Sequence, residues 1–153
     1  MRTAGGYTLI ELVVVIVITS ILAVVLVPRF IGRDAFDARG AHDTLLASLR
    51  YAQKLAIAQR TTVYANLNTS TRQLCLGYNS DCSAPVLDPR TQSAYVRQMA
   101  SSVVLTASTA VLGFDGLGRP VPNAAASYSV SNSVDLSMPT RTINVTVETG
   151  HVQ

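Results

Sequence analysis

The sequence predicts an α+β protein in which one long N-terminal helix packs on an antiparallel β-sheet. An almost unbroken apolar run ends at Val27, and apolar side chains then recur at helical spacing from Phe30 to Ala56. After Thr61 the pattern changes to short β-rich runs separated by turn residues. Of the 153 residues, a leader and an apolar helix take about 30, which leaves roughly 120 for one modest domain.

The apolar segment from Tyr7 to Val27 has the length of a membrane-spanning helix. Its 21 residues, at roughly 1.5 Å each, extend about 31 Å, the thickness of a bilayer's hydrocarbon core. From Leu12 onward only Thr19 and Ser20 are not aliphatic, and both hydroxyls can bond a carbonyl one turn back. The single charge is Glu11, near the start of the segment, where a carboxylate costs less than the roughly 2.5–3.5 kcal/mol of mid-bilayer.

Two glycines, Gly5 and Gly6, precede this apolar run. A secretory signal would instead place its small residues after a shorter apolar core. Cutting after Gly6 would remove only a six-residue basic leader and create a new amine on Tyr7, one helical turn from Glu11. An ordinary single-pass anchor that happens to follow two glycines is the alternative.

The residues from Gly6 to Glu11 read Gly-Tyr-Thr-Leu-Ile-Glu and resemble the class III signal of type IV pilins and type II secretion pseudopilins. This resemblance implies cleavage between Gly6 and Tyr7 by a prepilin peptidase, N-methylation of Tyr7, and a role for Glu11 in filament assembly. The family usually has phenylalanine at the position of Tyr7, and the aromatic ring is kept. Pro28 falls where many pilins carry a helix-bending proline.

The helical pattern continues beyond Pro28. Because proline lacks an N–H, a kink is expected near residues 24–28, and one helix from Thr8 to Gln59 would be about 78 Å long. Gly40 costs about 1 kcal/mol relative to alanine, so it marks a bend or a close packing contact. The predicted divisions are a leader (1–6), a transmembrane and filament-core helix (7–27), an amphipathic half of the helix (28–60) and a periplasmic β-sheet domain (61–153).

Short β-rich runs fill the predicted sheet domain. Residues 61–67 and 72–78 flank Asn68-Thr69-Ser70-Thr71, a natural hairpin loop. Further strands are expected at 94–99, 103–106, 111–114, 128–133 and 141–148. The Gly-x-Gly at 116–118 indicates a β-turn, because the prolines at 120 and 122 exclude the helix that a nucleotide loop requires.

Six residues separate Cys75 from Cys82, in a domain expected to be exported. A disulfide is the favoured interpretation and two free thiols the alternative, since only His42 and His151 could join the cysteines as soft metal ligands. A disulfide would indicate a periplasmic or extracellular location.

The charge pattern does not decide the orientation in the membrane. The net charge is +3, and Arg2 would leave with the leader. Arg29, Arg33 and Arg39 follow the apolar segment, which opposes a simple positive-inside reading. We therefore place the C-terminal domain outside on the leader resemblance and the cysteines.

A narrower resemblance covers the rest of the chain. Residues 49–57, the turn from Phe114 to Pro120 and Gly150 are similar to H-type pseudopilins and FimT-like minor pilins, and residues 36–40 with 49–59 look closest to the minor pilin of mannose-sensitive haemagglutinin pili. The resemblance implies a minor pilin of a type IV pilus, acting in filament assembly or priming and in surface adhesion. An H-type minor pseudopilin of a type II secretion system is the alternative.

The implied partners follow from this resemblance. They are major and other minor pilins or pseudopilins, the prepilin peptidase and an inner-membrane assembly platform. The protein would be held in the bacterial inner membrane by a single pass, with its C-terminal domain in the periplasm, before it enters a pilus or pseudopilus.

DNA binding and catalysis are the two remaining function classes. Some FimT-like minor pilins bind DNA during uptake, and Arg72, Arg119 and Arg141 would be the contacts, but the tail from Gly150 to Gln153 lacks the arginines of those relatives. Nucleic acid is thus a disfavoured partner. The sequence shows no Gly-x-Ser-x-Gly, metal-ligand cluster or placed acid pair, so no catalytic residue, metal or cofactor is expected and the protein is predicted not to be an enzyme.

Overall fold

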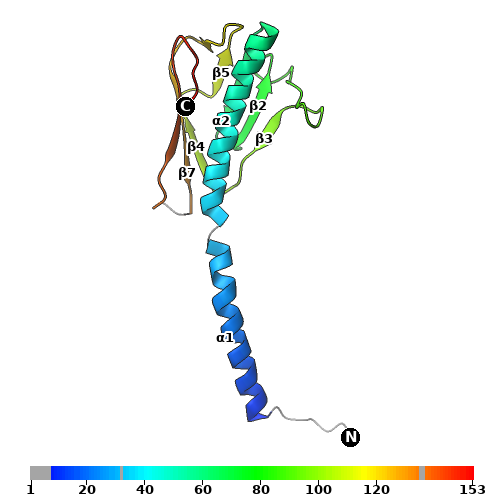
Figure 1. Cartoon of the computed structure of the whole chain (residues 1–153), viewed down its shortest axis with the longest axis vertical. Helices are drawn as coiled ribbons and strands as arrows, with labels where there is room; N and C mark the ends of the chain where they lie inside the picture. Colours follow the sequence, from blue (N-terminus) through cyan, green and yellow to red (C-terminus); the bar gives the residue numbers. More distant parts are fainter. Residues whose placement is uncertain (1–7, 32, 135–136) are drawn as a thin grey trace. The chain divides into compact units, whose positions relative to one another are not determined.

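The computed structural model describes residues 8–31, 33–134 and 137–153. The chain divides into two compact units, Met1–Arg33 and Asp34–Gln153. Helix α1 (Leu9–Ile31) belongs to the first unit. The second unit contains helix α2 (Arg33–Gln59), except for its first residue, and all the strands. Figure 1 shows these elements. The fold class predicted from the sequence is confirmed.

Helix α1 begins directly after Thr8. The Thr8 carbonyl accepts the amides of Glu11 and Leu12 at 3.1 and 3.2 Å, and the Glu11 amide also lies 3.4 Å from Thr8 Oγ1. Thr8 is therefore the N-cap, and Glu11 stands at the third helical position, the spacing of a capping box. The carboxylate also lies at the positive end of the helix dipole, where negative charge is stabilising.

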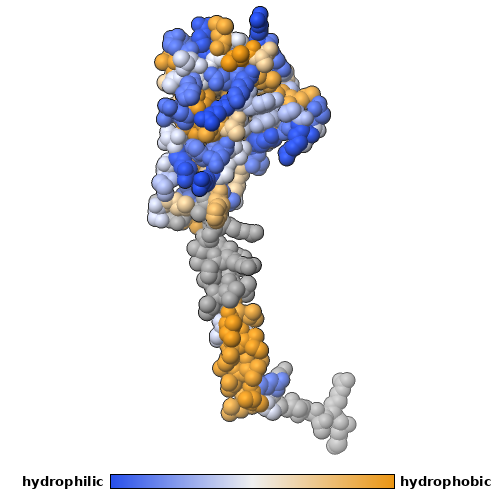
Figure 2. All heavy atoms as spheres, viewed as in Figure 1, coloured by the Kyte–Doolittle hydropathy of each residue, from blue (hydrophilic) through white to orange (hydrophobic). Residues whose placement is uncertain are grey.

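The two hydroxyl residues of α1 bond to the helix backbone, as predicted. Thr19 Oγ1 donates to the Val15 carbonyl at 2.8 Å, and Ser20 Oγ donates to the Ile16 carbonyl at 2.6 Å. Both hydroxyls therefore have a hydrogen-bond partner within the helix, whose coloured part is mostly hydrophobic in Figure 2.

The structure describes helix on both sides of Gly32. Helix α1 continues through Pro28 to Ile31, and α2 begins at Arg33. Gly32 itself lies outside the described residues. The uninterrupted helix from Thr8 to Gln59 and the kink expected at Pro28 therefore stay predictions.

Helix α2 buries one stripe of small and aliphatic side chains. The stripe follows the spacing of three and four residues that keeps side chains on one helix face, and its members are Ala38, Ala41, Leu45, Ser48, Leu49, Ala52 and Ala56. Gly40 lies off this stripe and is exposed. A Cβ added at Gly40 would meet no atom within 4 Å, so the close packing contact considered for this glycine does not exist.

The strands form two antiparallel sheets rather than one. The five-stranded sheet has the order β3-β2-β1-β5-β6, and the three-stranded sheet has the order β4-β7-β8. The strands are β1 (Val63–Asn68), β2 (Gln73–Gly77), β3 (Val96–Gln98), β4 (Val103–Ala107), β5 (Val111–Phe114), β6 (Pro120–Val121), β7 (Ala126–Asn132) and β8 (Arg141–Val145). Every predicted run contains a strand, while β6 was not predicted.

The hairpin of β1 and β2 has the expected loop. Strand β1 pairs with β2 from Tyr64 opposite Gly77 to Asn68 opposite Gln73. The Asn68 side chain accepts the amide of Thr71 at 2.9 Å, which is how asparagine stabilises a turn.

The core of the second unit lies between the α2 stripe and the inner faces of both sheets. Its largest fully buried side chains include Phe114 of β5, Tyr128 of β7 and Ile143 of β8. The first residue of this core cluster along the described chain is Ala41. Among the side chains that the structure describes, this core therefore contains none from α1.

Candidate functional site

The N-terminal processing residues can be placed only in part. Gly6 and Tyr7 lie outside the described residues, so cleavage and N-methylation stay predictions. Glu11 is exposed in the first turn of α1. Across residues 8–31, 33–134 and 137–153, no helix meets the combined length and apolarity required of a membrane span.

The predicted disulfide is present. Cys75 in β2 and Cys82 in the following loop are bonded, with an S–S distance of 1.95 Å. Asn66 of β1 also holds this loop, because its side-chain amide donates to the Ser80 carbonyl at 2.8 Å. The bridge therefore fixes residues 78–84 against the hairpin.

The three arginines proposed as DNA contacts lie on different elements. Arg72 ends the β1–β2 loop, where its carbonyl accepts the Met99 amide at 2.9 Å. Arg119 lies in the turn between β5 and β6 and pairs with Asp115 at 3.0 Å. Arg141 is the first residue of β8 and lines a cavity beside the start of α2.

Two of these arginines lie beside opposite ends of α2. The turn that carries Arg119 is held by Gln53, which donates to the Gly118 carbonyl at 2.9 Å. Arg141 shares its cavity with Arg39. Fourteen residues of helix separate Arg39 from Gln53, which is about 21 Å along the axis. Arg119 and Arg141 therefore lie on separate parts of the surface along α2.

The turn from Asp115 to Arg119 is a rigid β-turn, as expected. Asp115 Oδ1 accepts the amides of Leu117 and Arg119 at 2.9 and 2.8 Å. Burial raises the pKa of the Asp115 carboxyl, but these two amides and the Arg119 guanidinium outweigh it, so the pKa is lowered overall. Gly118 has a φ of 81°, which favours glycine.

A polar and aromatic cluster that was not predicted from the sequence fastens the loop between β2 and β3 to α2. Arg97 Nη2 lies 2.6 Å from Asp88 Oδ2, and its guanidinium lies 4.0 Å from the centroid of the Tyr95 ring. Tyr95 stacks on Tyr51 of α2 at 5.4 Å, and its hydroxyl lies 3.0 Å from Ser48 Oγ.

This cluster lowers the pKa of the Asp88 carboxyl. The main cause is the hydrogen bond from Arg97, followed by the hydrogen bond from the Arg90 amide. Asp88 and Arg97 lie nine residues apart in a stretch without periodicity, so no local pattern could have paired them.

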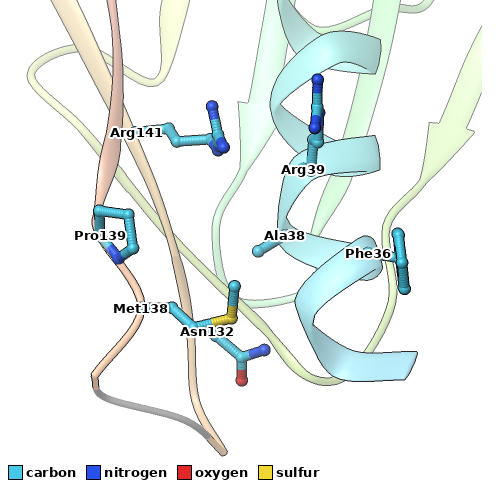
Figure 3. Close-up of a pocket in the computed structure, with 7 residues that line it drawn as sticks. All are labelled: Phe36, Ala38, Arg39, Asn132, Met138, Pro139 and Arg141. Atoms are coloured by element: carbon cyan, nitrogen blue, oxygen red, sulfur yellow. The ribbon is translucent and has the colours of Figure 1, made fainter. Parts of the chain in front are cut away.

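A cavity of about 200 Å³ lies between the first turns of α2 and the residues that lead into β8 (Figure 3). It was also missed, because its lining combines Phe36 and Arg39 with Met138 and Arg141, about one hundred residues later. Among the described residues, no group of three or more His, Cys, Asp or Glu side chains is arranged to hold a metal ion.

Comparisons with known proteins agree with the predicted leader and fold. Residues 1–27 match the family described as the prokaryotic N-terminal methylation motif. No curated protein is a significant match to the chain.

Solved structures show the same fold. The crystal structure of the type IV minor pilin FimU of Pseudomonas aeruginosa is similar with a TM-score of 0.60 and 18% identity, covering 75% of this chain and 90% of that chain. The minor pseudopilin EpsH from the type II secretion system of Vibrio cholerae is similar with a TM-score of 0.61 and 11% identity, covering 76% and 94%. The chain therefore has the α+β pilin fold.

Proposed function

We propose that this protein is a minor subunit of a type IV pilin-like filament with no enzymatic activity. The observation that carries the proposal is the combination of an N-terminal methylation motif at residues 1–27 with a pilin fold in the rest of the chain. A prepilin peptidase would cut between Gly6 and Tyr7, and the new amine of Tyr7 would be methylated. Mass spectrometry of the mature protein should find a chain that begins with N-methylated Tyr7, and any other start would refute the proposal.

Before assembly, residues 7–27 would cross the inner membrane and the C-terminal domain would lie in the periplasm. Support comes from α1, whose large apolar side chains from Leu9 to Leu22 are 40–80% exposed, an apolar surface that needs a cover. The disulfide of Cys75 and Cys82 suits an oxidising compartment. In the filament, neighbouring helices would replace the lipid around α1.

Glu11 would act when neighbouring helices replace the lipid around α1. We infer that its carboxylate pairs with the Tyr7 amine of a neighbouring subunit in the dry core of the filament. Removing one partner of a buried ion pair costs about 3–5 kcal/mol. Glu11 also stands at the capping-box spacing from Thr8, whose Oγ1 lies 3.4 Å from the Glu11 amide, so a variant that deletes the side chain could weaken the helix start as well.

Glu11→Gln separates the two roles, because glutamine can serve in a capping box but carries no charge. The variant should insert into the membrane and be cleaved like the wild type, yet fail to enter filaments. Thr8→Ala is the matched control, because it removes the cap and keeps the carboxylate. Normal incorporation of Glu11→Gln would refute the ion pair.

We further propose that the filament is a type IV pilus, in which this subunit acts in assembly or priming and in surface adhesion, as the resemblance to the minor pilin of mannose-sensitive haemagglutinin pili suggests. An H-type minor pseudopilin of a type II secretion system is the second candidate, since FimU and EpsH are about equally similar in fold. Deleting the gene should abolish surface pili in the first case and protein secretion in the second. DNA binding is the weaker alternative, because Arg119 and Arg141 lie beside opposite ends of α2 and Arg72 lies on the β1–β2 loop. Salt-sensitive binding of the protein to DNA would support this alternative.

A further inference from the structure

The cavity beside the start of α2 joins apolar walls to two cationic groups. Arg39 from α2 and Arg141 from β8 line it, together with Ala38, Met138 and Pro139. In Figure 3 the Arg141 side chain extends from β8 toward α2, where Arg39 projects from the helix. The two guanidinium groups therefore come from separate elements to one cavity.

Neither Arg39 nor Arg141 has a hydrogen-bond or ion-pair partner among the residues that the structure describes. The counter-charge that acts on both is Asp43, whose Oδ1 lies 3.0 Å from His42 Nδ1. The hydrogen bond with His42 is the main cause that lowers the pKa of the Asp43 carboxyl, and the charges of Arg39 and Arg141 lower it further through space. Asp43 therefore offsets part of this positive charge, and the hydrogen-bond donors of both guanidinium groups remain open to a ligand.

Exposed apolar side chains accompany these cations. Phe36, which also lines the cavity, is 75% exposed, and Val134, two residues beyond the lining residue Asn132, is 68% exposed. Large apolar side chains next to cations are typical of surfaces that lie in the interfacial layer of a membrane. An aqueous periplasm alone would give neither Phe36 nor Val134 a favourable surrounding.

The chain itself keeps this surface close to the bilayer, if residues 7–27 span the membrane as proposed above. Phe36 follows Val27 by nine residues. Nine residues cover about 14 Å as helix and at most about 32 Å fully extended. The headgroup layer extends roughly 5–8 Å beyond the hydrocarbon core, so the cavity meets this layer only if the chain between Val27 and Phe36 runs along the membrane surface, which the proposal requires.

We propose that Arg39 and Arg141 bind the phosphate of an anionic phospholipid headgroup in the periplasmic leaflet while the subunit waits in the inner membrane. Guanidinium groups bind phosphate through paired hydrogen bonds. Phe36 lies in the interfacial layer beside the bound headgroup. This inference rests on the proposed membrane-held state and adds a lipid ligand to it.

The test uses the full chain in nanodiscs of phosphatidylcholine, alone or mixed with phosphatidylglycerol. The chain has no tryptophan, so Phe36→Trp introduces a single fluorophore at the proposed interface. Lipids brominated near the headgroup should quench its emission more strongly when phosphatidylglycerol is present. Equal quenching in both kinds of disc would overturn the proposal.

Charge variants in the Phe36→Trp background locate the binding groups. Each cation near an anionic surface changes binding about fivefold, so Arg39→Gln with Arg141→Gln should lower the docked-to-undocked ratio roughly 30-fold. The matched control is Arg60→Gln with Arg90→Gln, which removes the same charge from two exposed arginines that do not line the cavity. Equal losses in the two double variants would mean general charge attraction and would overturn the site.

Two further outcomes distinguish a failure of the proposed membrane-held state from a failure of the lipid site alone. If alkaline carbonate extracts the wild-type chain from bacterial membranes, the proposed membrane-held state fails. If the chain resists extraction and the emission responds only when other filament subunits are added, the surface is a subunit contact and the lipid site alone is overturned. Unchanged thermal unfolding of both double variants, expected because all four arginines are exposed, shows that folding is intact.

Discussion

Replacing Gly40 by alanine should stabilise the second unit. Gly40 lies inside α2, is exposed, and would place a Cβ where no atom lies within 4 Å. Glycine in a helix interior is about 0.5–1 kcal/mol less favourable than alanine, because its unfolded chain has more freedom to lose. For a unit of this size, Gly40→Ala should raise the midpoint of thermal unfolding by about 2–4 °C.

The assay is thermal unfolding of the full chain in detergent, followed by circular dichroism. Gly118→Ala is the matched control, since it makes the same chemical change at a φ of 81° and would place the Cβ 2.7 Å from Ile57 Cδ1. It should destabilise by about 1–2 kcal/mol. A lower midpoint for Gly40→Ala would refute the reasoning and would indicate that α2 needs a bend at this residue.

Three further predictions concern buried groups of the second unit. The Tyr128 hydroxyl is buried without a hydrogen-bond partner among the described residues, so Tyr128→Phe should stabilise by about 1 kcal/mol in denaturant unfolding; a loss of stability would reveal an ordered partner such as water. The pKa of the Asp88 carboxyl lies below its unfolded value of 3.8. The stability that Asp88 contributes is therefore present above pH 3.8 and is lost as the pH falls through the folded pKa. Arg97→Gln should destabilise the protein most near neutral pH and less in acid, and a loss of stability that does not change with pH would contradict this. Reduction of the bridge between Cys75 and Cys82 should cost about 2 kcal/mol by the loop-entropy relation, while the double serine variant should not respond to reductant.

Local patterns made much of this fold predictable. Apolar residues at helical spacing identified the buried stripe of α2, and alternation with a turn-forming Asn68 identified the β1–β2 hairpin. Strand β6 escaped because it has only two residues and begins with Pro120, which cannot donate to a strand ladder. The division into two sheets was also beyond reach, because pairing between distant strands leaves no mark in the local sequence.

The candidate sites likewise include one that the local sequence predicted and one that it did not. Cys75 and Cys82 could be paired from their number, spacing and expected compartment. The cavity of Arg39 and Arg141 could not be found, because its halves come from opposite ends of the domain sequence. The DNA contacts proposed at Arg72, Arg119 and Arg141 stay a prediction. The structure places these arginines on different elements, an arrangement that residue type alone could not indicate.

Among the side chains that the structure describes, the core contains none from α1, so the second unit could keep its fold in both surroundings that the proposed function requires. Among the described residues, eleven large apolar side chains of α1 are exposed. At about 1.5–3 kcal/mol for full burial of each, their exposure to water costs on the order of 10 kcal/mol even when only half of this applies. Lipid and neighbouring apolar helices relieve that cost about equally, because helices in lipid gain little hydrophobic energy by associating. If the proposed function holds, movement from membrane to filament would gain little hydrophobic energy and would depend on helix packing and on the polar contacts that differ between the two states. This is why loss of the Glu11 charge should stop assembly.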